Sequence, residues 1–153
     1  MQINRYYEIF EFSDDCVPSM TLRSGNEIDN YDNPISFEEL IDVPNDKCLE
    51  DFYYGMSYLD SKSWKYYLPI FIDYSLRNYI TSNSIVIDSL ISSLRPPERE
   101  PPRLSTLNEE QKKAIVTFLD TLAFDNKSIW KNEAMVALEE YWAPGALYKS
   151  RGK

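Results

Sequence analysis

Apolar residues recur at helical spacing along most of the chain. Over residues 3–12 they fall at i, i+3, i+4 and i+7, on one helical face, although the aromatic content makes a strand a rival interpretation. Residues 13–34 are polar and rich in turn signals, so they predict a loop. A short helical turn follows, with Ser36 as its cap, Leu40 within it and Pro44 at its end.

The middle of the chain predicts two helices. The first opens at Asn45 or Asp46 and weakens at Gly55. Asp60 caps the second, which carries a wide apolar stripe. Because Pro69 lies inside this stripe, a kink or a break is expected one turn before it. The stripe consists of Trp64, Tyr67, Leu68, Phe71, Ile72 and Leu76.

Three more helices are predicted towards the C-terminus. Ser84 precedes one whose β-branched start keeps a strand as the rival. Asn108 caps the next, with Gln111 in capping-box position. The last runs from about Ser128 to Tyr141. Their core positions are Ile87, Leu90, Ile91 and Leu94 in the first; Ala114, Ile115, Phe118, Leu119 and Leu122 in the second; and Trp130, Ala134, Ala137, Leu138 and Tyr141 in the third.

These patterns predict a mainly α fold, a single compact domain of about five helices over residues 1–153. An acidic, loop-rich and irregular N-terminal section (1–44) precedes a helical core (45–143) and a frayed tail (144–153). The segment 94–102, which contains four prolines, is compatible with either a docking motif or a connector between helices. Its place between two amphipathic helices favours the connector.

The charge distribution singles out the N-terminal section. Residues 1–50 hold 3 basic and 12 acidic side chains, a net of −9, which is the net charge of the whole chain. This excess argues against nucleic-acid binding. No apolar run reaches the length of a membrane helix and the N-terminus does not resemble a signal peptide, so the expected location is cytoplasmic and no membrane partner is expected.

Few residue types suited to catalysis are present. The chain has no histidine, which removes His-based nucleophile systems and His-ligated zinc. Cys16 and Cys48 lack metal or redox spacing and are interpreted as buried thiols. The acidic pairs at 109–110 and 139–140 point about 100° apart on a helix, which favours solvated faces. Residues 26–33 lack the ligand pattern of a calcium loop. No cofactor, metal or enzymatic activity is predicted.

Three segments resemble a family of short uncharacterised bacterial proteins, a domain of unknown function. They are "MSYLDSKSWKYYLPIFIDYSL", "LISSLRPPE", and "LNEEQKKAIVTFLDTL" with the later "ALEEYW", in order over roughly residues 48–142. The first 35 residues show no clear counterpart. The blocks are similar to the family's Tyr-Tyr-Leu-Pro, Leu-x-Pro-Pro and Leu-x-x-Glu-Gln-x-x-Ala-Val-x-x-Phe-Leu motifs. The resemblance implies fold and boundaries but no activity.

The functional hypothesis is a non-catalytic protein-binding module. Its most specific form is an immunity- or antitoxin-like protein that masks a basic partner. The alternatives are a small enzyme that depends on carboxylates and tyrosine, or a self-associating structural subunit; the sequence does not fix the oligomeric state. The predicted partner-binding residues are Asp29, Asp32, Glu38, Glu39, Asp42, Tyr53 and Tyr54.

Overall fold

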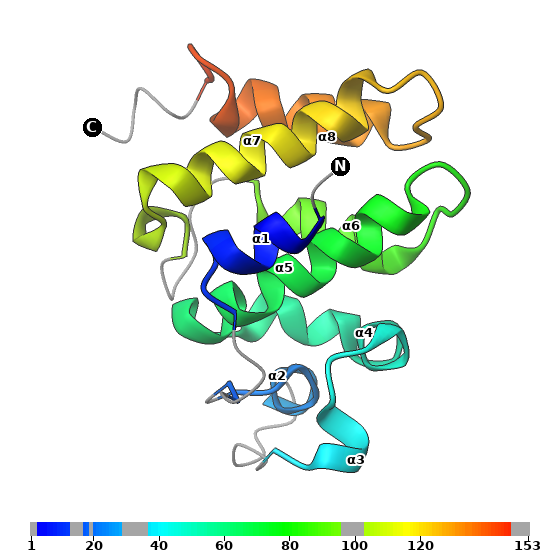
Figure 1. Ribbon diagram of the computed structural model, residues 1–153, viewed down its shortest axis with the longest axis vertical. Coiled ribbons are helices and arrows are strands. Elements are labelled where there is room, and N and C mark those ends of the chain that lie inside the picture. The colour runs from blue at the N-terminus through cyan, green and yellow to red at the C-terminus, as the bar shows by residue number, and fades with distance from the viewer. Residues whose placement is uncertain (1–2, 13–16, 19, 29–36, 96–102, 148–153) are drawn as a thin grey trace.

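The computed structural model describes residues 3–12, 17–18, 20–28, 37–95 and 103–147, and every regular element in them is helical (Figure 1). The predicted mainly α, single compact domain is confirmed. No helix in these residues is both long and apolar enough to cross a bilayer. The α-helices are α1 (Ile3–Ile9), α2 (Leu22–Ile28), α3 (Glu39–Asp42), α4 (Asp46–Phe52), α5 (Ser61–Asn78), α6 (Ile85–Ser93), α7 (Glu109–Phe124) and α8 (Lys131–Ala137). Two 3₁₀-helices, η1 (Tyr53–Tyr58) and η2 (Leu104–Thr106), and a π-helical turn, η3 (Leu138–Trp142), complete them.

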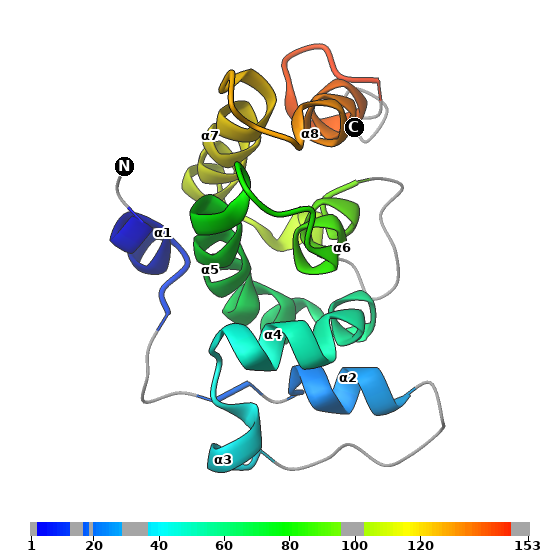
Figure 2. The same ribbon diagram turned by 90° about the vertical axis from the view of Figure 1, so that its right-hand side faces the viewer.

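The hydrophobic core forms around α5 and α6. Helices α7 and α8 cover these two on one side, and α4 and α2 lie on the other (Figures 1 and 2). Helix α1 packs across α5 and α7. The largest fully buried side chains, Trp64, Tyr67, Phe71 and Phe118, come from the predicted apolar stripes of α5 and α7. The sequence periodicity therefore identified the faces that meet in the core.

The predicted caps fix the helix starts. Asn45, Asp60 and Ser84 each accept a backbone N–H from the first turn of the helix that follows. Asn108 and Gln111 form the predicted capping box, with the Asn108 side chain 2.8 Å from the Gln111 nitrogen and the Gln111 side chain 3.0 Å from the Asn108 nitrogen. The predicted caps are therefore confirmed. They could be predicted from the sequence because each cap involves only residues that are neighbours in the chain.

Residues 3–9 are helical, not a strand, and α1 ends in a Schellman motif. The Phe12 nitrogen donates to the Tyr7 oxygen at 2.9 Å, and the Glu11 nitrogen donates to the Glu8 oxygen at 3.1 Å. The rings of Tyr7 and Phe12, 5.1 Å apart, supply the apolar contact of the motif. Glu11 occupies the left-handed position, with φ of 57°, where glycine is the usual residue.

Helix α2 corrects the prediction of a loop over residues 13–34. Apart from Leu22, the buried residues described in this helix are the small or polar Ser24 and Gly25, so the sequence shows no apolar stripe here. Two tertiary contacts hold it: the Leu22 nitrogen donates to the Tyr67 hydroxyl at 3.1 Å, and Gly25 lies against Gly55 of η1. A Cβ on Gly25 would stand 2.7 Å from the Gly55 oxygen, so this crossing requires glycine.

Two details of the middle helices are decided by the structure: the break that was the alternative to a kink before Pro69 does not occur, and the preceding helix ends earlier than predicted. Helix α5 runs without a break through Pro69, although the ring removes one backbone hydrogen bond. Pro69 is itself buried, as are the apolar Leu68 and Ile70 on either side of it. The preceding α-helix ends at Phe52 rather than near Gly55, and the chain tightens into η1.

The last helix differs from its prediction at both ends. It begins at Lys131, because Ser128 accepts the Trp130 nitrogen at 3.0 Å in a turn before the helix. At the other end, the Ala143 nitrogen donates to the Leu138 oxygen at 2.8 Å, which closes a π-helical turn. The wider turn buries Trp142, whereas Tyr141, the predicted core residue, is half-buried.

The ends of the proline-rich connector are anchored. Arg95 donates twice to Glu140, and the buried Arg103 donates to the oxygens of Ser57 and Leu59. The prolines at 96–102 lie outside the described residues. The predicted frayed tail is held as far as Leu147, whose nitrogen donates to the Glu139 oxygen at 3.0 Å.

Candidate protein-binding surface

Helix α3 is positioned by one buried ion pair. Asp42 is fully buried, and both of its oxygens accept from Arg23, at 3.0 Å from Nε and 2.8 Å from Nη2. The same carboxylate accepts the Glu38 nitrogen at 2.9 Å, at the helix start. Since the predicted cap Ser36 lies outside the described residues, Asp42 is the side chain seen to fix this helix onto α2.

This geometry corrects the prediction that Asp42 contacts a partner. A carboxylate that is 0% exposed and bound to Arg23 cannot meet another protein surface, so Asp42 has a structural role. Arg23 is the cation of this buried pair, and its Nη2 also stands 3.9 Å from the Glu38 carboxylate.

Acidic residues beyond α3 are also paired within the molecule. Arg77 donates to Asp46 at 2.8 Å and 3.0 Å and lowers the pKa of that carboxyl. Lys47 contacts Asp51 at 2.6 Å. Glu38 and Glu39 are the predicted contact carboxylates that remain exposed in the described residues.

Apolar side chains surround these two carboxylates. Leu40 is 97% exposed, and Ile41 and Val43 are 41% and 43% exposed. A hollow of about 230 Å³ beside them is lined by Leu40, Ile41, Val43, Asn45, Lys47, Cys48, Asp51 and Phe52. We define the α3 face as Glu38, Glu39, Leu40, Ile41 and Val43. Figure 2 shows that α3 stands away from the helices of the core.

The two predicted tyrosines lie on η1 rather than on α3. Tyr53 is partly buried against the core, whereas Tyr54 is 47% exposed. The Tyr54 hydroxyl lies 3.1 Å from that of Tyr58, and their rings are 5.5 Å apart. Tyr54 therefore presents a second exposed contact point. Asp29 and Asp32 lie outside the described residues.

Among the groups considered for chemistry, Cys48 is buried, Glu109 and Glu140 are paired, and Glu110 and Glu139 are exposed. Burial raises the pKa of the Cys48 thiol to about 12, which makes it a poor nucleophile; Cys16 lies outside the described residues. Glu109 stands 3.6 Å from Lys112, and Glu140 is bound by Arg95. In the ranges that the structure describes, no three His, Cys, Asp or Glu side chains gather as metal ligands.

Sequence reasoning missed Leu40, Ile41 and Val43 as surface residues. The pattern "EELIDV" is typical of an amphipathic turn whose apolar residues face inward. In the structure the inward-facing residue is Asp42, because Arg23 of α2 lies beneath it. Only the position of a residue 19 places earlier in the chain decides which side of α3 faces solvent.

The fold and this surface define an all-α single-domain protein with an exposed acidic and apolar edge. The chain belongs to a family of unknown function, DUF6714, whose model matches residues 4–146. The match includes the N-terminal section, which the sequence resemblance did not reach. Searches of curated proteins and of solved structures found no match.

Proposed function

We propose that this protein is a non-catalytic binding module that recognises a basic protein partner through the α3 face. The observation that carries the proposal is Leu40, 97% exposed on a helix held by a buried ion pair. Burying a leucine side chain yields about 1.5–3 kcal/mol, which the isolated protein forgoes. An apolar residue held in this way is suited to fill a pocket on a partner.

Glu38 and Glu39 give the α3 face its charge. They precede the apolar residues of this face and lie within residues 1–50, whose net charge of −9 equals that of the whole chain. Exposed carboxylates of this kind accelerate association with a basic surface, and the acceleration weakens with added salt. The partner is therefore expected to combine Lys or Arg side chains with an apolar recess.

A finer form of the proposal is an immunity- or antitoxin-like protein that acts in the cytoplasm by masking a basic enzyme. The concentrated acidity supports this form, as does the burial of the Cys48 thiol. A toxin gene beside the gene for this chain would agree with it. A metabolic operon in that place would instead favour the small-enzyme alternative.

The test begins with affinity capture from cells of the source organism, followed by kinetics with the purified partner. Leu40→Ala is expected to accelerate dissociation by about tenfold or more. Glu38→Gln with Glu39→Gln is expected to slow association and to reduce its salt dependence. Glu109→Gln with Glu110→Gln removes the same charge from α7, and Phe124→Ala truncates an apolar residue that is 63% exposed elsewhere. These matched variants are expected to bind like the wild type.

Rates that do not change with salt or with these α3 substitutions would remove the α3 face from the proposal. If the captured protein is a second copy of this chain, the self-associating alternative is correct. Sizing in solution at several concentrations distinguishes that outcome directly.

A further inference from the structure

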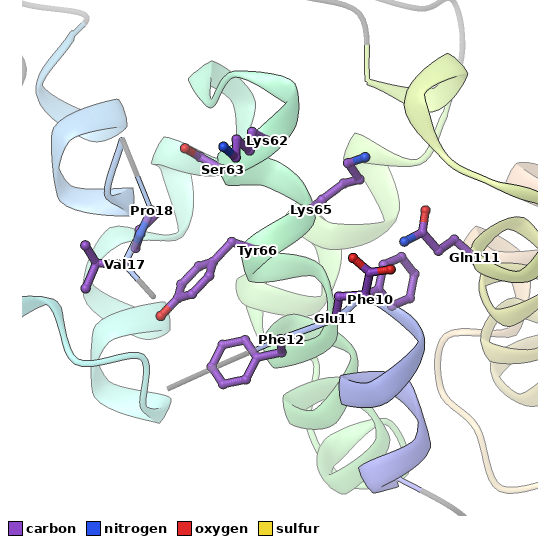
Figure 3. Close-up of a pocket in the computed structure, with 10 residues that line it drawn as sticks. All are labelled: Phe10, Glu11, Phe12, Val17, Pro18, Lys62, Ser63, Lys65, Tyr66 and Gln111. Atoms are coloured by element: carbon purple, nitrogen blue, oxygen red, sulfur yellow. The ribbon is translucent and has the colours of Figure 1, made fainter. Parts of the chain in front are cut away.

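A second recess lies beside α5 and is independent of the α3 face. It has a volume of about 510 Å³ and is formed by the end of α1, the residues that follow it, the first turns of α5 and the start of α7 (Figure 3). Its lining is Phe10, Glu11, Phe12, Val17, Pro18, Lys62, Ser63, Lys65, Tyr66 and Gln111. The volume lies within the range of small-molecule sites. We call this recess the α1–α5 pocket.

Aromatic rings form one wall of the pocket. The rings of Phe12 and Tyr66 lie 5.1 Å apart, and Tyr66 packs edge-on against the buried Tyr67 at 4.9 Å. The wall is supported from behind, so it presents a fixed apolar surface. Val17, 55% exposed, stands at the opposite end of the pocket from Gln111 (Figure 3). Such a surface accepts an aromatic or aliphatic body.

Two lysines give the pocket a charge opposite to that of the protein. Lys62 and Lys65 lie three residues apart on α5 and both line the pocket. Lys65 donates to the Thr106 oxygen at 3.2 Å, and no ion pair within the described residues involves Lys62. The Asp60 carboxylate caps α5 and accepts the Ser63 nitrogen, so the attraction for an anion comes from the two ammonium groups rather than from the helix start.

Among the described residues of the lining, Glu11 is the one carboxylate, and together with Lys62 and Lys65 it gives these residues a net charge of +1. It is held there by a backbone with φ of 57°, a conformation in which a glutamate is strained. Gln111 closes the pocket beside it, but its amide is engaged in the capping box and in a contact with the Ile9 oxygen. A ligand with one negative charge balances this lining, whereas a second negative charge would meet Glu11.

We propose that the α1–α5 pocket binds a small amphipathic monoanion, with its apolar body against Phe12 and Tyr66 and its anionic group at Lys62 and Lys65. A free carboxylate and a lipid phosphate share this chemistry. The pocket holds the anion by charge and the body by contact, so both parts contribute to affinity. This site does not depend on the binding function assigned to the α3 face.

The experiment uses the full chain and two fluorescent probes with the same aromatic body. Anilinonaphthalenesulfonate carries one negative charge, and phenylnaphthylamine carries none. Lys62→Gln with Lys65→Gln is expected to weaken sulfonate binding by about tenfold or more and to leave the neutral probe within about twofold. Glu11→Gln is expected to strengthen sulfonate binding. Lys113→Gln with Lys127→Gln, two exposed lysines elsewhere, is the matched control and is expected to change neither.

Competition identifies the class of ligand. Decanoate is expected to displace the sulfonate probe, whereas inorganic phosphate at equal ionic strength is not. Displacement by vesicles of anionic lipid but not by decanoate would assign the same chemistry to a lipid headgroup. Sulfonate binding that is equal in the wild type and the lysine variant, or displaced by phosphate alone, would overturn the proposal. Lys62→Gln alone removes no hydrogen bond from the fold and repeats the test if the double variant unfolds.

Discussion

At the scale of single residues, burial separates side chains that look equivalent in the sequence. Phe118 and Phe124 both lie on α7, but Phe118 is fully buried and Phe124 is 63% exposed. Truncation of Phe118 to Ala is expected to lower the free energy of unfolding by about 3–5 kcal/mol, because it removes a ring from a packed core. Phe124→Ala is the matched control and is expected to change that energy by less than about 0.5 kcal/mol. Urea denaturation measures both, and equal effects would mean that α7 faces the other way.

Glu11 illustrates strain at one residue. Its left-handed backbone is more favourable for glycine, so Glu11→Gly is expected to stabilise the protein by about 0.5–1 kcal/mol. Glu8→Gly removes the same charge within the regular part of α1 and is expected to destabilise by about 1 kcal/mol. The opposite signs distinguish backbone strain from charge. If both variants lose stability in urea denaturation, the Schellman geometry at Glu11 is not the source of strain.

At the scale of elements, two N-terminal helices depend on one buried ion pair. Arg23→Ala leaves the Asp42 carboxylate buried without the guanidinium, and the expected loss in the free energy of unfolding is about 3–5 kcal/mol. Lys47→Ala breaks an exposed pair with Asp51 and is expected to lose less than about 1 kcal/mol. A small loss for Arg23→Ala, with faster hydrogen exchange confined to α3, would show instead that α3 detaches on its own.

At the scale of the whole molecule, ion pairs between distant elements make stability depend on pH. Hydrogen bonds from Arg95 hold the pKa of the Glu140 carboxyl below its ordinary value of 4.5. Because the folded-state pKa is depressed, the stabilisation is fully present above pH 4.5 and is lost as the pH falls through the lower folded-state pKa. The two side chains are 43% and 24% exposed, so solvent limits the contribution to about 1 kcal/mol.

Glu140→Gln is therefore expected to lower the free energy of unfolding at pH 7 and to have little effect at pH 3. Its neighbour Glu139, which is exposed, provides the matched variant Glu139→Gln, and this variant is expected to follow the wild type at both pH values. Urea denaturation at pH 7 and pH 3 gives the comparison. An equal loss from Glu140→Gln at both pH values would show that packing, rather than charge, explains the contact between Arg95 and η3.

The sequence by itself determined the elements whose signals are local. Apolar periodicity predicted the core faces of α5, α6 and α7. The capping residues Asn45, Asp60, Ser84 and Asn108 predicted the starts of α4, α5, α6 and α7, because each signal lies within one or two helical turns. The charge count likewise identified the acidic N-terminal section. A charge count cannot distinguish a carboxylate exposed to solvent from one that is buried.

Only the tertiary structure decided the features that join distant residues. Helix α2 is held by the packing of Gly25 against Gly55 and by the hydrogen bond between Leu22 and Tyr67. These contacts join residues 30 and 45 positions apart, so they produce no periodic pattern in the sequence. Arg23 draws Asp42 inward and so leaves Leu40 in solvent, which reverses the apparent amphipathicity of α3. The α1–α5 pocket gathers Glu11, Lys62 and Gln111 from three helical regions. Local sequence patterns identify the buried faces of helices. Which side chains of a short element remain exposed depends instead on the residues that pack against it, and these come from distant parts of the chain.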